Sequence, residues 1–182
     1  MRALHLAVAG LLATVALPAG AQTAAAHGPQ GLERPAAHVT LLRDAARDGS
    51  VIVALFSLPG CPYCEAIRRE QLRHLAREQA AQRLRVVEYD LTDRTPFAGT
   101  PAHAPGAAQP ASGAADASGA VLPRSAAALA ASLDVRVAPT VAFLGPDGKE
   151  IAERLVGYSS PEFYGAYLEQ RIAQARTRLG AR

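Results

Sequence analysis

Tryptophan is absent from this sequence of 182 residues, methionine occurs once, and cysteine occurs only twice. A chain of this length can bury a core of its own without a scaffold of disulfide bonds. The two cysteines are therefore available for chemistry. The sequence also lacks a strong excess of one charge, because its formal net charge is +3. This balance gives no indication of a nucleic-acid partner.

Long hydrophobic runs are also lacking, with one exception near the start of the chain. The run Leu4–Leu17 is too short to span a bilayer and ends in the small-residue pattern Pro18-Ala19-Gly20-Ala21. We therefore expect residues 1–21 to be a signal peptide cleaved near Ala21, in preference to a core helix or a membrane anchor. The residue directly after this site is Gln22 and not a cysteine, which argues against a lipid anchor. The protein is then expected in the periplasm, an oxidising compartment.

The remainder alternates between helical and extended patterns. Helices are predicted at 36–48, 65–82, 125–133 and 161–178, and strands at 51–56, 84–91, 140–144 and 150–156. The turn sequence Gly145-Pro146-Asp147-Gly148 joins the last two strands as an antiparallel hairpin. This order predicts an α/β domain over residues 36–182 with one central sheet flanked by helices. Residues 22–35 are expected to be a flexible N-terminal segment.

One stretch interrupts this order. Residues Arg94–Pro123 are rich in alanine, glycine, proline and serine and have few large apolar side chains. Such a composition buries too little surface to offset the entropy lost on ordering. We predict a disordered, low-complexity insertion on the surface. A role as a lid or a docking segment is the less favoured alternative.

Both cysteines lie in the segment Cys61-Pro62-Tyr63-Cys64, where a continuously apolar strand turns into a helix. A cysteine in the first turn of a helix faces unpaired N–H groups and the positive end of the helix dipole, which favour the thiolate. Cys61 has this position, and Pro62 suits helix entry. Cys64 is expected below the surface, within disulfide distance of Cys61. The pair can therefore exchange disulfides with a substrate.

Three other interpretations of the cysteines are less favoured. A permanent disulfide across so short a loop would stabilise the fold little. A zinc site would need further ligands, and the histidines show no ligand spacing, so no metal is expected. Inert buried cysteines do not fit the Pro59-Gly60 approach to a helix start.

The strand, the C-P-Y-C motif and the later segment from Leu133 to Tyr158 together resemble the thioredoxin superfamily. The resemblance implies a thioredoxin-like α/β fold and a redox-active disulfide without a bound cofactor. It also implies that Pro139 is a cis-proline packed against the disulfide, and that the backbone of Ala138 pairs with a bound peptide. With these go Pro62, Tyr63 and Thr140 as supporting or substrate-binding residues. Gly157 corresponds to the glycine that ends the hairpin.

Two departures from the family pattern bear on the chemistry. Leu55 stands where thioredoxins carry a buried aspartate, and Gly60 replaces the usual tryptophan. Secreted thioredoxin-like reductants, including those linked to sulfur oxidation, are the most similar subgroup. Because Glu65 is expected to place a carboxylate on the same helix face as Cys61, a reducing pair is predicted.

These observations predict a periplasmic, monomeric thiol-disulfide oxidoreductase that reduces protein disulfides. Its partners would be cysteine-containing proteins and an electron donor in the periplasm or its membrane, with no nucleic acid. A disulfide donor of the same fold is one alternative. A peptide-binding module braced by a permanent disulfide is another.

Overall fold

The computed structural model describes residues 26–27, 31–100, 122–158 and 161–180. The predicted signal peptide and the middle of the predicted insertion, residues 101–121, lie outside this part of the chain. The strands are β1 (Ala26–His27), β2 (Glu33–Arg34), β3 (Val51–Ser57), β4 (Leu84–Asp90), β5 (Thr140–Leu144) and β6 (Glu150–Val156). The helices are α1 (His38–Asp48), α2 (Pro62–Ile67), the π-helical turn η1 (Arg68–Leu72), α3 (Arg73–Arg77), α4 (Ala126–Ser132) and α5 (Pro161–Gly180).

The strands form one mixed sheet in the order β1-β2-β4-β3-β5-β6. The central strand β3 is parallel to β4 and antiparallel to β5. Every residue of β3 is buried, as its continuously apolar sequence predicts. β5 and β6 form the predicted antiparallel hairpin.

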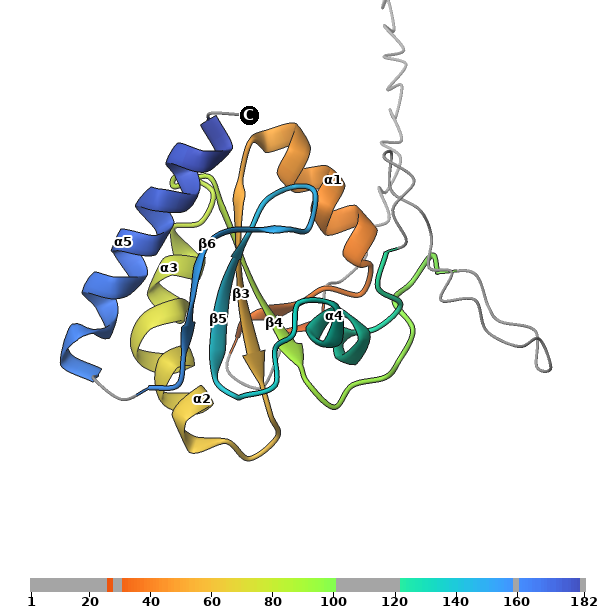
Figure 1. The fold of residues 1–182 in the computed structure, drawn as a ribbon, viewed down its shortest axis with the longest axis horizontal. Helices are drawn as coiled ribbons and strands as arrows, with labels where there is room; N and C mark the ends of the chain where they lie inside the picture. The colour runs from red at the N-terminus through yellow and green to blue at the C-terminus, as the bar shows by residue number, and fades with distance from the viewer. Residues whose placement is uncertain (1–25, 28–30, 101–121, 159–160, 181–182) are drawn as a thin grey trace, which may run out of the picture.

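Helices cover both faces of this sheet, with α1 and α4 on one face and α2, α3 and α5 on the other (Figure 1). Alternate residues of β3 point to opposite faces of the sheet. Ile52 and Ala54 pack toward α1, whereas Val53 and Leu55 pack toward α5. The fold is therefore a three-layer α/β arrangement, and the predicted fold class is confirmed.

The helix predicted at 65–82 is present as one continuous helical stretch from Pro62 to Arg77, made of α2, η1 and α3, and it stops short of residues 78–82. The wide turn η1 buries both Arg68 and Leu72 against the sheet. The helical stretch ends at Arg77, and Gln79 then bonds to β4, its backbone carbonyl accepting from the Leu84 N–H and its side-chain oxygen from the Val86 N–H. Local helix propensity is thus overridden by contacts with the sheet.

The ordered fold begins earlier than the predicted boundary at residue 36. Leu32 is fully buried, and β2 pairs in parallel with β4 through Glu33 and Val87. Two short strands before α1 therefore extend the sheet. Because each of these strands has only two residues, no alternating pattern in the sequence could predict it.

The two ends of the predicted insertion also pack into the fold. Phe97 and Leu122 are buried in the core on the α1 side. The Phe97 N–H donates to the carbonyl of Arg124 at 2.7 Å, and the Ala98 N–H donates to that of Ala36 at 2.7 Å. The prediction of disorder from residue 94 to residue 123 is thus wrong at both ends.

Candidate active site

Cys61 and Cys64 are joined in a disulfide at the start of α2, with their Cα atoms 5.3 Å apart. Cys61 is the N-cap residue and Pro62 follows at the first helical position, as predicted. The Cys61 Sγ accepts a hydrogen bond from the backbone N–H of Cys64 at 3.1 Å. One of the otherwise unpaired N–H groups of the helix start is thus directed at this sulfur.

The two sulfurs differ in their access to solvent. Cys64 is fully buried, whereas Cys61 is partly exposed beside Tyr63, which is 61% exposed. A substrate can therefore reach Cys61 from outside, while Cys64 can be reached only through Cys61. This is the division of labour that disulfide exchange requires.

The segment before β5 lies at the same end of the sheet. Thr140 pairs with Phe56, and β3 leads from Phe56 directly into the loop that carries Cys61. The Ala138–Pro139 peptide bond is cis, the isomer that the resemblance implies. The Pro139 carbonyl accepts a hydrogen bond from the Gly157 N–H at 2.8 Å, so this oxygen is already bonded within the β5–β6 hairpin. Ala138, the residue before it, lies beyond the paired residues of the two strands and is partly exposed.

A buried ion pair joins η1, the helical turn that follows α2, to β4 of the sheet. Arg68 donates from Nη2 to Glu88 Oε1 at 2.6 Å and from Nε to Glu88 Oε2 at 3.1 Å. Ser57, the last residue of β3, donates to the same carboxylate at 2.6 Å. Since Glu88 is fully buried and Arg68 nearly so, both charges depend on these bonds.

Arg68 and Glu88 were not among the predicted site residues, although β4 carries a signal for Glu88. Leu84, Val86 and Glu88 are alternate residues of one strand, so all three side chains point to the same face. An acidic residue on that buried face requires a partner. Its register partner on β3 is Leu55, the position where thioredoxins were expected to carry an aspartate.

Glu65 has a different environment from the one predicted. Its carboxylate accepts a hydrogen bond from Arg68 Nη1 at 2.5 Å. The charge of Glu65 is therefore balanced by a neighbour one turn further along the helix. The predicted repulsion between Glu65 and a Cys61 thiolate is correspondingly weakened.

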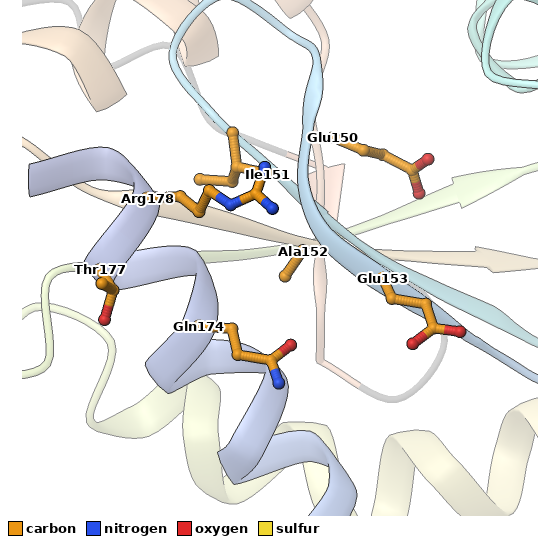
Figure 2. Close-up of a pocket in the computed structure, with 7 residues that line it drawn as sticks. All are labelled: Glu150, Ile151, Ala152, Glu153, Gln174, Thr177 and Arg178. Atoms are coloured by element: carbon orange, nitrogen blue, oxygen red, sulfur yellow. The ribbon is translucent and has the colours of Figure 1, made fainter. Parts of the chain in front are cut away.

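A pocket of about 330 Å³ opens beside Cys61. It is lined by Arg34, Leu58, Pro59, Gly60, Cys61, Pro62, Glu65 and Arg68. The redox sulfur thus shares a pocket with two arginines and one carboxylate. A larger pocket of about 630 Å³ lies away from the disulfide, between β6 and α5, where Glu153 and Arg178 line it with Gln174 (Figure 2).

The described residues contain neither a metal-ligand cluster nor a membrane-spanning helix. No group of three or more histidine, cysteine, aspartate or glutamate side chains there could hold a metal ion. No helix in that part of the chain combines the length and apolar character needed to cross a bilayer.

The sequence also matches a known family, through the model of the thioredoxin-like domain, over residues 40–172. This chain belongs to the thioredoxin-like family. The match covers both cysteines, the Arg68–Glu88 pair and the segment 138–140. The prediction of a thiol-disulfide oxidoreductase is confirmed at the level of this family, whose fold carries the Cys61–Cys64 disulfide here.

The solved structures that are similar to this chain share little sequence with it. Periplasmic thioredoxin SoxS from Paracoccus pantotrophus in its reduced form is 22% identical, with a TM-score of 0.39, covering 69% of this chain and 99% of that one. Fasciola hepatica thioredoxin is 20% identical, with a TM-score of 0.46, covering 77% and 95%. A DsbH oxidoreductase is 18% identical, with a TM-score of 0.46, covering 93% and 95%. No curated protein matches the chain. Membership of the thioredoxin-like family therefore rests on the domain match.

Proposed function

We propose that this thioredoxin-like protein is an exported reductase of protein disulfides. The observation that carries the proposal is the asymmetry of the disulfide, in which Cys61 is partly exposed at a helix start and Cys64 is fully buried. No bound cofactor is needed, because the two sulfurs themselves carry the electron pair.

The reaction follows from this geometry in two exchanges. In the reduced protein the Cys61 thiolate attacks a substrate disulfide, which forms a mixed disulfide and releases one substrate thiolate. The Cys64 thiolate then attacks the Cys61 sulfur and releases the second substrate thiolate. The substrate gains two electrons, the Cys61–Cys64 disulfide is formed again, and two protons from solvent complete the substrate thiols. An electron donor must then reduce the pair.

The proposal that the substrates are proteins is supported by apolar side chains near the disulfide. Leu58 and Tyr63 flank the disulfide, and Val137 precedes the cis-proline; all three are exposed. Exposed apolar groups around a reactive centre favour contact with a partner chain. In this proposal Pro62, Tyr63, Ala138, Pro139 and Thr140 support or bind the substrate peptide.

The reducing direction is supported by the sparse stabilisation of Cys61. Near it, the charges of Arg34 and Arg68 are matched by those of Glu65 and Glu88. The N–H groups of the helix start are then the main groups that favour the thiolate. Equilibration with glutathione buffers tests this, and a potential more oxidising than about −150 mV would instead indicate a disulfide donor.

Activity itself is tested by the reduction of insulin with dithiothreitol and catalytic amounts of the protein. Turnover that is lost in Cys61→Ser supports the proposal. A protein that binds insulin without accelerating its reduction would be a peptide-binding module with a permanent disulfide.

Export, the substrates and the donor are tested in the cell. We propose that residues 1–21 direct the protein to the periplasm, where it acts as a monomer. Periplasmic protein whose first residue is Gln22 would support this, and exclusively cytoplasmic protein would contradict it. Mixed disulfides captured from the periplasm by Cys64→Ser would identify the substrates.

A further inference from the structure

A second arginine reaches the pocket beside Cys61 with donor groups that the described residues leave unused. Arg34, the last residue of β2, has a side chain that is 37% exposed and lines the same pocket as Cys61. Its Nε is buried and has no hydrogen-bond partner among the described residues. A guanidinium has five N–H donors, and the Nη groups of this partly exposed side chain, which make no hydrogen bond within the described residues, are the donors that a ligand can reach.

The nearest carboxylate cannot supply the missing partner. Glu88 lies 3.6 Å from Arg34 Nη2, which is beyond hydrogen-bond length, and its oxygens already accept from Arg68 and Ser57. Asp93 is also near enough for the charge of Arg34 to contribute to lowering its pKa, but that carboxylate accepts hydrogen bonds chiefly from Thr95. Arg34 is thus attracted by these two carboxylates, but neither of them accepts a hydrogen bond from it.

The other charged groups in the pocket are paired with each other. Arg68 donates to both Glu88 and Glu65, so its guanidinium is occupied on both edges. Glu65 is in turn balanced by Arg68. Arg34 therefore remains the cation in the pocket that can receive an anion.

We propose that Arg34 binds a carboxylate of the substrate next to the disulfide that Cys61 attacks. The preferred substrates would be disulfides flanked by acidic groups, because Arg34 and Cys61 line one pocket of about 330 Å³. This volume accepts one side chain or one small ring. The inference rests on the proposed function and adds a substrate class to it.

Two aromatic disulfides test the inference with the full-length reduced protein. Dithionitrobenzoate carries a carboxylate on each ring, whereas dithiodipyridine is neutral, and each releases a thiol product that is followed by its absorbance. The second-order rate constant for each is measured by stopped flow. The ratio of the two constants, anionic over neutral, cancels any general change in the reactivity of Cys61.

We expect Arg34→Gln to lower this ratio about five-fold or more, as loss of a charge-assisted hydrogen bond implies. Arg34→Lys keeps the charge and should give an intermediate ratio. The matched control is Arg43→Gln, which removes one exposed arginine from α1 on the opposite face of the sheet and should leave both rates unchanged. An unchanged ratio in Arg34→Gln, or an equal change in Arg43→Gln, would overturn the inference.

A measurement on the unaltered protein covers the case in which Arg34→Gln does not fold. The anionic rate should fall more steeply with added salt than the neutral rate, because ions screen the attraction. Parallel salt dependence would contradict a role for Arg34. If the reduced protein reacts with neither compound faster than free dithiothreitol, the proposed function fails instead.

Discussion

Cys61 and Cys64 are three residues apart and yet differ in exposure, because one helical turn places the first at the surface and the second beneath it. In the reduced protein Cys61 should be the thiol of lower pKa, since it faces the N–H groups of the helix start. We expect iodoacetamide near neutral pH to modify Cys61 at least about ten-fold faster than Cys64. Peptide mapping by mass spectrometry measures both rates.

The two serine variants provide the corresponding functional test. Cys61→Ser should abolish insulin reduction, whereas Cys64→Ser should accumulate mixed disulfides that it cannot resolve. Equal alkylation of both thiols in the reduced protein would contradict this assignment of roles.

His38 is a second residue whose environment has a measurable consequence. It is buried, its Nδ1 lies 2.8 Å from the Tyr89 hydroxyl, and burial lowers its pKa from 6.5 to about 4. The unfolded chain therefore binds a proton at a higher pH than the folded protein does. The stability that the neutral imidazole contributes is present above about pH 6.5 and is lost as the pH falls toward 4.

We expect this residue alone to lower the free energy of unfolding by about 2 kcal/mol between pH 7.5 and pH 5. Urea unfolding at the two pH values measures the loss. The variant His38→Gln lacks the titrating group and should lose less stability over the same interval. An identical loss in both proteins would show that other groups account for the acid sensitivity.

At the scale of elements, the attachment of η1 to β4 depends on a buried ion pair. Arg68→Met would leave the buried Glu88 carboxylate with one hydrogen bond from Ser57 and with Arg34, 3.6 Å away, as its remaining ion-pair partner. We expect a loss of about 3 kcal/mol in the free energy of unfolding, because a buried carboxylate that loses its two hydrogen bonds from Arg68 is costly inside a protein. Denaturant unfolding of the variant measures this loss.

The double variant Arg68→Met/Glu88→Gln should recover most of the lost stability, since neither charge then remains buried. The neighbouring exposed residue provides the control, because Arg69 pairs with Glu70 at the surface and Arg69→Met should cost less than about 1 kcal/mol. Similar losses in Arg68→Met and Arg69→Met would show that the buried pair contributes little.

Most elements could be predicted from local patterns, and the failures have physical causes. The buried strand 51–56 and the turn at residues 145–148 carry strong local signals, and both are present. The predicted helix 65–82 is present only as far as Arg77 and contains the wide turn η1, because Arg68 and Gln79 bond to β4. In the site, the C-P-Y-C motif is contiguous and could be recognised. Glu88 carries a signal in the alternation of β4, whereas Arg34 carries none, because only the pairing of β2 with β4 brings it to the site.

At the scale of the whole molecule, the insertion is attached to the core at both ends. Phe97 is buried and its ring lies 5.5 Å from that of His38 in a stacked arrangement. We expect Phe97→Ala to lower the free energy of unfolding by about 3 kcal/mol, as removal of a buried phenyl ring does. Arg94→Ala, at an exposed position nearby, should change it by less than about 0.5 kcal/mol.

Thermal or denaturant unfolding of the two variants distinguishes a packed end from a loose one. If both variants unfold like the unaltered protein, the ends of the insertion contribute nothing to the core, and the prediction of a disordered insertion would hold for them.

The position of β3 between β4 and β5 has a consequence for biosynthesis. Chains are made from the N-terminus, so the residues of β3, α2 and β4 leave the ribosome well before those of β5. Until residues 140–144 arrive, one edge of the most apolar strand has no partner, although both cysteines are already present. A nascent chain that stopped at that stage would expose the unpaired edge of an apolar strand beside two free thiols. Its vulnerability to aggregation and wrong disulfide pairing should therefore be greatest before residues 140–144 are made.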